Sequence, residues 1–206
     1  MKMFTKDYWL SSAKELKNTR SLALAALICA LTVVLDGAAT IKFIPNVLEI
    51  KFTFFVIALG CAVYGPVTGM VIAAVVDTLC FFLANNGYAY FPGYMLTEVL
   101  VALTYGLFFY RQKITVAKLF GAKLCTNFLW HVGLNTLWST ILYDKGYLYY
   151  LGASLIKNAA ALLPEVLIMA VVFAVMIPPL SKVGLLPAHS QKELRRLTLF
   201  SKKENQ

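Results

Sequence analysis

Four polar or aromatic side chains recur along one apolar stretch, residues 123–143. Asn127, His131, Asn135 and Trp138 follow one another at intervals of four, four and three residues. In an α-helix these intervals place side chains on one face. The stretch is apolar enough to cross a membrane, and polar groups facing lipid are costly, so this face should turn toward protein or a wet cavity. The pattern indicates a path or site for a ligand or an ion.

The composition around this stretch is that of a membrane protein. Of 206 residues, 60% are hydrophobic and 14% are charged, which is far from the balance of a soluble domain. The four cysteines all lie in apolar runs without a CxxC pair, so we expect buried hydrophobic side chains rather than disulfides or a metal site. The net charge of +9 comes mainly from the chain ends and one central loop, which indicates membrane topology rather than nucleic-acid binding.

The apolar runs predict an all-α membrane protein with six transmembrane helices. The expected spans are about 22–39, 52–64, 67–83, 95–110, 123–143 and 155–177, the last ending at Pro178-Pro179. The second span is short for a full crossing, and a tight turn at Gly65-Pro66 separates it from the third. Residues 1–21 should form a cytoplasmic or interfacial segment, 22–178 the six-helix domain, and 179–206 a basic cytoplasmic tail. In the first segment, Ser12 and Glu15 fit a capping box for a short surface helix.

The distribution of Lys and Arg predicts that both termini are cytoplasmic. Six spans place the two ends on the same side. That side carries five basic residues in the N-terminal segment, four in the loop from Arg111 to Lys123 and six in the tail, against four on the other side. Because cytoplasmic loops carry the excess of positive charge, the loops at 40–51, 85–94 and 143–154 should face outward.

Candidate binding residues gather near these outward loops. Aromatic faces can stack on a flat ring, amides can form in-plane hydrogen bonds, and two cations can hold an anionic group. A flat heteroaromatic molecule with a carboxylate would suit this set. An interfacial aromatic belt would explain the tyrosines at 147–150, but it would not explain the asparagines. The candidates are Lys51, Phe91, Tyr94, Glu98, His131, Asn135, Thr136, Trp138, Lys157 and Asn158.

The sequence contains no motif for ATP hydrolysis or for common hydrolytic chemistry. The P-loop, HExxH and GxSxG patterns do not occur, and no paired metal ligands occur. We therefore expect no catalytic residue, metal or cofactor. Asp77, alone in the third span, could bind a proton or cation, although such an Asp more often accepts hydrogen bonds from neighbouring helices.

In order and spacing, these pieces resemble the substrate-binding S components of energy-coupling factor (ECF) vitamin importers, in particular their folate family. The resemblance covers about residues 10–178. It rests on YGPVTG (64–69) leading to Asp77, FPGYMLTEVLVALTYGLFFY (91–110), LNTLWSTILY (134–143), LIKN (155–158) and Pro164-Glu165. It implies a six-helix bundle in a prokaryotic plasma membrane that captures a vitamin from outside with high affinity.

The resemblance also implies partners. Such proteins assemble with a transmembrane coupling subunit and two ATPase subunits, so ATP would be used by other chains. Family members dock on the coupling subunit through a small-xxx-small motif in the first span, which Ala26 and Ala30 match here.

One departure from the family pattern leaves the identity of the substrate undecided. Folate binders of this family tend to carry an Arg shortly before the Lys-Asn pair of the last span, and Gly152-Ala153-Ser154 stands there instead. A missing cation weakens recognition of the carboxylates of folate. Folate is thus the leading substrate, with pantothenate or another small anionic vitamin as the alternative. A stand-alone secondary transporter using Asp77 or Glu98 for protons is a further alternative; inverted repeats would favour it, and the sequence shows none.

Overall fold

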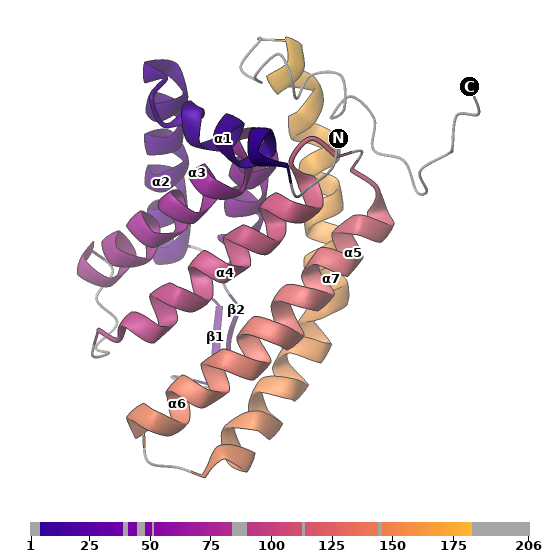
Figure 1. Ribbon diagram of the computed structural model, residues 1–206. Coiled ribbons are helices and arrows are strands. Elements are labelled where there is room, and N and C mark those ends of the chain that lie inside the picture. Colours follow the sequence, from indigo (N-terminus) through magenta and orange to yellow (C-terminus); the bar gives the residue numbers. More distant parts are fainter. Residues whose placement is uncertain are drawn as a thin grey trace.

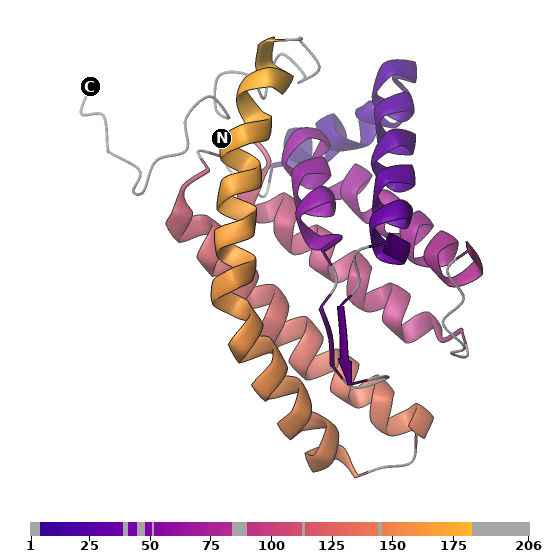
Figure 2. The ribbon, with the colours of Figure 1, turned by 180° about the vertical axis from the view of Figure 1, so that it is seen from behind.

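The computed structural model describes residues 5–38, 41–44, 48–50, 52–83, 90–112, 114–143 and 146–182. Most of these residues form helices that pack as a bundle (Figure 1; Figure 2). The helix α1 (Lys6–Glu15) lies across one end of the bundle. The elements that follow are α2 (Thr19–Ala38), α3 (Phe54–Leu83), α4 (Pro92–Phe109), α5 (Val116–Cys125), the π-helix η1 (Thr126–Leu134), α6 (Asn135–Tyr143) and α7 (Tyr147–Lys182).

Four of the described helices are long and apolar enough to cross a membrane, namely Thr19–Ala38, Phe54–Leu83, Pro92–Phe109 and Tyr147–Pro178. The helix α3 covers both the second and the third predicted spans. Its helical backbone is broken between them at Gly65. The fifth predicted span is divided among α5, η1 and α6, which continue one another as one rod along α7 (Figure 1). The membrane-helical architecture is confirmed, whereas the six crossings and the cytoplasmic termini stay predictions.

Several predicted boundaries were wrong. The expected loop at 40–51 contains an antiparallel pair of short strands, β1 (Ile41–Ile44) and β2 (Leu48–Ile50). The rod of the fifth span begins at Val116, where the Thr115 hydroxyl accepts the first capping bond from Lys118 N at 3.2 Å. Lys118 and Lys123, counted in a loop, therefore belong to a helix.

Two helix-end signals were also misread. Pro178-Pro179 does not end α7, which continues to Lys182; membrane helices tolerate Pro where neighbouring groups satisfy the freed backbone. Ser12 does not cap α1, because Thr5 stands at the N-cap position and Ser12 lies inside the helix, fully buried.

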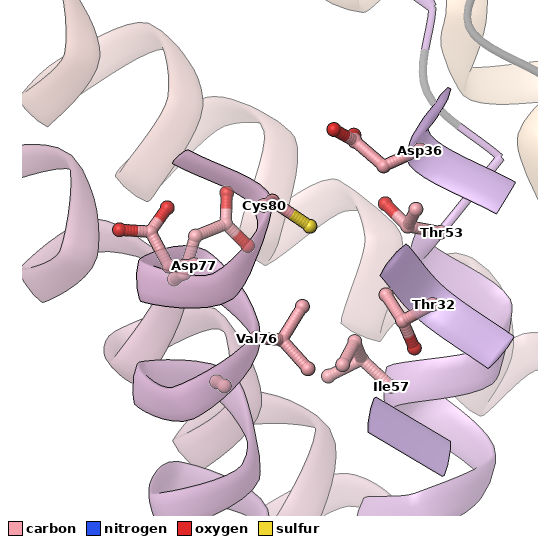
Figure 3. A pocket seen from close by; sticks show the side chains of 9 residues that line it. Thr32, Asp36, Thr53, Ile57, Val76, Asp77 and Cys80 are labelled. Carbon is pink, nitrogen blue, oxygen red and sulfur yellow. The ribbon is translucent and has the colours of Figure 1, made fainter. Parts of the chain in front are cut away.

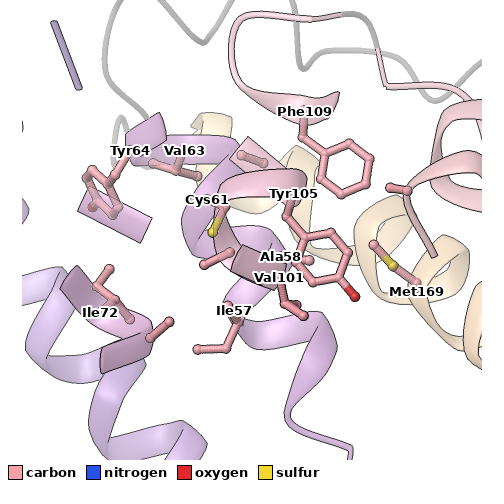
Figure 4. Packing of buried hydrophobic residues seen from close by; sticks show 14 of the residues in the cluster. Ile57, Ala58, Cys61, Val63, Tyr64, Ile72, Val101, Tyr105, Phe109 and Met169 are labelled. Atoms are coloured by element: carbon pink, nitrogen blue, oxygen red, sulfur yellow. The ribbon is translucent and has the colours of Figure 1, made fainter. Parts of the chain in front are cut away.

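The core lies where α3, α4 and α7 meet (Figure 4). Ala58 and Ala102 are fully buried, and such small residues allow two helices to approach closely. Tyr105 and Phe109 of α4 stack with ring centroids 5.8 Å apart, and Phe109 lies 5.6 Å from Phe173 of α7. The aromatic rings therefore join the α3–α4 pair to the last helix.

Gly106 permits a close approach of α4 to Pro66 of α3, and we predict that Gly106→Ala lowers stability. A methyl group there would lie 2.5 Å from Pro66 Cα, which is backbone and cannot rotate away. Overpacking of this kind costs about 1–3 kcal/mol, which thermal unfolding in detergent would detect. The matched control is Gly152→Ala in α7, where a methyl group meets nothing within 4 Å. Equal stability of the two variants would contradict the close-packing account.

Candidate ligand-binding site

An aromatic cluster joins the start of α4 to α6. Phe91 precedes α4, and Pro92 at its first position is preorganised for a helix start. The ring centroid of Phe91 lies 5.6 Å from that of Trp138 and 6.0 Å from that of Tyr94. Gly93 leaves room for this contact, since a side chain there would collide with the rings of Phe91 and Trp138. The structure thus brings together three residues predicted for the site.

Hydrogen bonds fix the orientation of these rings. The indole Nε1 of Trp138 donates to Thr97 Oγ1 at 3.1 Å. The Tyr94 and Ser139 hydroxyls lie 3.0 Å apart. Both contacts join α4 to α6, so the aromatic faces are held on two rigid elements rather than on a loop. Thr97 and Ser139 were not predicted, because nothing in their type or spacing marks them in the sequence.

The polar stripe of η1 and α6 turns toward α7. Asn135 Nδ2 lies 3.3 Å from His131 Nδ1, and the Ser154 hydroxyl donates to the His131 carbonyl at 3.3 Å. Asn158 Nδ2 donates to the Ser154 carbonyl at 2.8 Å, and Asn127 Nδ2 contacts the Asn158 carbonyl at 3.4 Å. The stripe therefore forms an interhelical seam, with His131, Asn135 and Asn158 all part of it.

The π-helix changes the phase of this stripe. At its end, the backbone N–H of Asn135 bonds to the carbonyl of Trp130, five residues earlier. A π-helical turn holds one more residue than an α-helical turn, and such segments are frequent at functional sites. In an α-helix, four residues rotate slightly more than one full turn about the axis, whereas in a π-helix they rotate slightly less. Asn127, His131 and Asn135 therefore stay on the side of the rod that faces α7. No feature of the amino-acid pattern predicted this change of helix type.

A buried ion pair lies at the α5 end of the seam. Lys123 Nζ is 3.0 Å from Glu165 Oε2, with side-chain exposures of 2% and 14%. Asn127 Nδ2 donates to the same carboxylate oxygen at 2.9 Å, and the ammonium group lies 4.1 Å from the ring centroid of Phe54. Lys123 was predicted to be a loop charge, and this pair was not predicted. The available signal was an ionisable residue of each sign inside an apolar stretch.

Three buried acceptors on the same rod have no hydrogen-bond partner in the part of the chain that the structure describes. They are Asn127 Oδ1, Asn135 Oδ1 and Thr136 Oγ1. Asn127 and Thr136 are each only 1% exposed. Because buried polar groups are nearly always paired, these atoms can accept N–H or O–H groups from a bound molecule or from water. Thr136, a predicted site residue, contributes one of them.

Glu98 lines a small cavity between α2, α3 and α4 (Figure 3). The cavity measures about 60 Å³, which is room for water but far below the size of a drug-sized ligand site. Asp36 and Asp77 line it together with Glu98, and so do Thr32, Thr53, Ile57, Ala73, Val76 and Cys80. The structure therefore brings together Asp77 and Glu98, the two candidate proton carriers.

The remaining predicted residues divide by location. Lys157 is half-buried in α7, next to Asn158. Lys51 lies outside the described residues. Ala26 and Ala30 are both exposed on α2. Among the described residues, no group of three His, Cys, Asp or Glu side chains is arranged to hold a metal ion.

The ion pair predicts a non-additive mutational response. Lys123→Met leaves the Glu165 carboxylate buried without its cation, which should lower stability by about 3–5 kcal/mol. The double variant Lys123→Met, Glu165→Gln keeps an acceptor for Asn127 and removes both charges, so it should recover most of that loss. Thermal unfolding of the single and double variants measures the coupling. Additive losses would show that the two groups act independently.

Comparisons with known proteins identify the family of this chain. The model of the family described as "ECF transporter, substrate-specific component" matches residues 20–181. Folate transporter FolT of Clostridium novyi is 31% identical over 113 residues, which span 55% of this chain and 65% of the relative. Folate transporter FolT of Leuconostoc mesenteroides is 30% identical over 147 residues, spanning 68% of this chain and 77% of the relative.

A solved structure shares the fold. The crystal structure of FolT bound with folic acid superposes with a TM-score of 0.68 at 27% identity, covering 74% of this chain and 91% of that one. The family match includes the aromatic cluster, the seam and the ion pair, all of which lie within residues 20–181. The chain therefore belongs to the family of substrate-specific (S) components of ECF transporters.

Proposed function

We propose that this S component binds folate on the outer side of a prokaryotic plasma membrane and delivers it through an ECF transporter. The observation that carries the proposal is the aromatic cluster of Phe91, Tyr94 and Trp138, on a scaffold that matches FolT bound with folic acid. A folate molecule offers a flat pterin ring for such faces, and aromatic pairs gain about 0.5–1.5 kcal/mol beyond burial.

The polar residues near the cluster support the same substrate. The pterin ring carries N–H donors, and Asn135 Oδ1 and Thr136 Oγ1 are buried acceptors available to them. Lys157 and Lys51 are proposed to hold a carboxylate. His131 and Asn158, which bond within the seam, are proposed to orient these groups. Glu98 lines a small cavity with Asp36 and Asp77, and we propose that it lies at the edge of the site.

The proposed orientation in the membrane does not depend on Lys123, which is buried in a helix and not in a loop. Without this buried residue, fourteen basic residues remain on the side of the termini against four on the other. Six crossings with both termini in the cytoplasm therefore remain the proposed topology, with α3 contributing two crossings around Gly65. The loops that flank the aromatic cluster then face outward, where a vitamin arrives.

The partners are proposed to be a transmembrane coupling subunit and two ATPase subunits. On α2, Ala26 and Ala30 present small side chains on an exposed face, which allows a partner helix to approach closely. ATP would be hydrolysed by those partners, in keeping with the absence of a P-loop in this sequence.

Pantothenate or another small anionic vitamin is the alternative substrate. It is favoured by Gly152-Ala153-Ser154, which offers no cation where folate binders tend to have one. The helix α7 runs through these residues without a break, so no local rearrangement supplies a replacement there. One cation from Lys157 would suffice for a vitamin with a single carboxylate.

Tryptophan fluorescence tests the substrate. We predict that folate quenches the emission of the purified protein in a saturable manner and that pantothenate does not, because Trp138 lies in the cluster. The control Trp138→Phe keeps an aromatic face but should lose most of the signal, while Trp9 and Trp130 remain. Trp138→Ala should weaken binding measured by calorimetry roughly tenfold. A response to pantothenate alone would move the substrate within the same family.

Co-purification tests the docking face. We predict that Ala26→Leu with Ala30→Leu abolishes capture of the coupling subunit and ATPases, because two Leu side chains separate the helices, while folate affinity is unchanged. The matched control is Ala174→Leu, an exposed alanine on α7. Assembly that survives the double substitution would show that α2 is not the docking helix.

A further inference from the structure

The helix α1 contacts the bundle through one face only. Tyr8 is 1% exposed and Ser12 is fully buried, and their spacing of four residues places them on the same side. On the other side, Lys6, Leu10 and Lys14 are exposed. The helix lies across the end of the bundle where α3 turns back on itself (Figure 1). Its attachment therefore depends on a small number of identifiable contacts.

The Ser12 hydroxyl completes the backbone hydrogen bonding of the α3 break. It donates to the Tyr64 carbonyl at 2.8 Å and accepts from the backbone N–H groups of Val67 at 3.0 Å and Thr68 at 3.3 Å. The Thr68 hydroxyl in return donates to the Ser12 carbonyl at 2.7 Å. Helix ends leave such groups unpaired, and a residue next to the helix usually caps them. Here the capping side chain comes from more than fifty residues away.

The same helix is joined to the end of α4. The Tyr8 hydroxyl donates to the Gly106 carbonyl at 2.9 Å, and the rings of Tyr8 and Tyr110 lie 5.2 Å apart. The Ser11 and Tyr110 hydroxyls are 3.2 Å apart. Burial raises the pKa of the Tyr8 phenol above its ordinary value, so it remains a donor at all physiological pH. Thus α1 holds α3 and α4 together at this end.

Two nearby residues, Cys61 and Glu15, relate the contacts of α1 to the core and to α2. Cys61, about one turn before the α3 break, is 1% exposed and lies in the core next to this end. Glu15, at the end of α1, accepts a 2.6 Å hydrogen bond from the Ser21 hydroxyl of α2. The helix α2 carries the exposed Ala26 and Ala30. The helix α1 therefore connects α2, the proposed docking helix, to the buried part of the core around Cys61.

We propose that α1 is a releasable latch that closes the α3-turn end of the bundle, and that the coupling subunit releases it on binding α2. The latch itself rests on the contacts above; its release rests on the function and orientation proposed in the previous section. When α1 leaves, the Tyr64 carbonyl and the Val67 and Thr68 N–H groups need water as a partner. Undocking therefore hydrates this end of the bundle. The coupling subunit shifts the equilibrium only if it binds the undocked form more tightly. The family match begins at residue 20, after α1.

Thiol labelling of Cys61 tests the latch. In a variant with Cys29, Cys80 and Cys125 replaced by Ala, Cys61 should react slowly with a polar maleimide in detergent. Ser12→Ala and, separately, Tyr8→Phe should each raise the labelling rate at least tenfold while folate affinity stays within twofold. The control Leu10→Ala changes the exposed face of α1 and should leave the rate unchanged. Because Tyr8→Phe removes a single oxygen, it keeps the test valid if Ser12→Ala does not fold.

The outcomes separate the latch from the proposed function. Unchanged labelling in both variants overturns the latch, and so does faster labelling accompanied by loss of folate binding, which would indicate a loosened fold. Adding the coupling subunit with its two ATPases should raise Cys61 labelling of the otherwise unaltered chain. Unchanged labelling in an assembled complex overturns release by the partner. If the protein with native Tyr8 and Ser12 does not bind folate and its labelling still rises on Ser12→Ala, the substrate is refuted and the latch is supported.

Discussion

The buried ion pair between Lys123 and Glu165 joins α5, the first part of the α5–η1–α6 rod, to α7. A charge in the membrane interior is costly unless it is paired and hydrogen-bonded, and Asn127 adds a hydrogen bond to the same carboxylate. The pair fixes α5 against α7 in one register. A seam of amide and hydroxyl contacts follows the pair between the rod and α7 toward α6. The rings of the aromatic cluster are held further along the rod by hydrogen bonds between α4 and α6.

The opposite side of the bundle depends on a different constraint. The break at Gly65 has a φ of 86°, a conformation that glycine adopts readily and other residues rarely do. It exposes backbone groups that must find partners where little water is present, and α1 supplies them through Ser12. The same turn brings Pro66 against Gly106. A terminal helix that looks peripheral in the ribbon therefore completes the packing of α3 and α4.

The proposed binding site and the contacts of α1 lie at opposite ends of α4. The cluster of Phe91, Tyr94 and Trp138 lies at one end of α4, and the contacts of Tyr8 and Ser11 lie at its other end. The helix α2 stands at the side, with small residues exposed. The acidic cavity at Asp36, Asp77 and Glu98 lies where α2, α3 and α4 meet. The proposed binding site, docking face and latch therefore use different parts of one bundle.

The sequence by itself determined the class of protein, the candidate aromatic residues and the family, because these follow from hydropathy, from spacing along one element and from motifs that stay in order. Phe91, Tyr94 and Trp138 were found in this way, and the structure brings them together. Only the tertiary structure decided the partners of Lys123 and Ser12. Lys123 looked like a loop charge and Ser12 like a local cap. Each role depends on a residue distant in sequence. Local pattern carries no information about such contacts, since they arise only when separate helices bury their polar groups against one another.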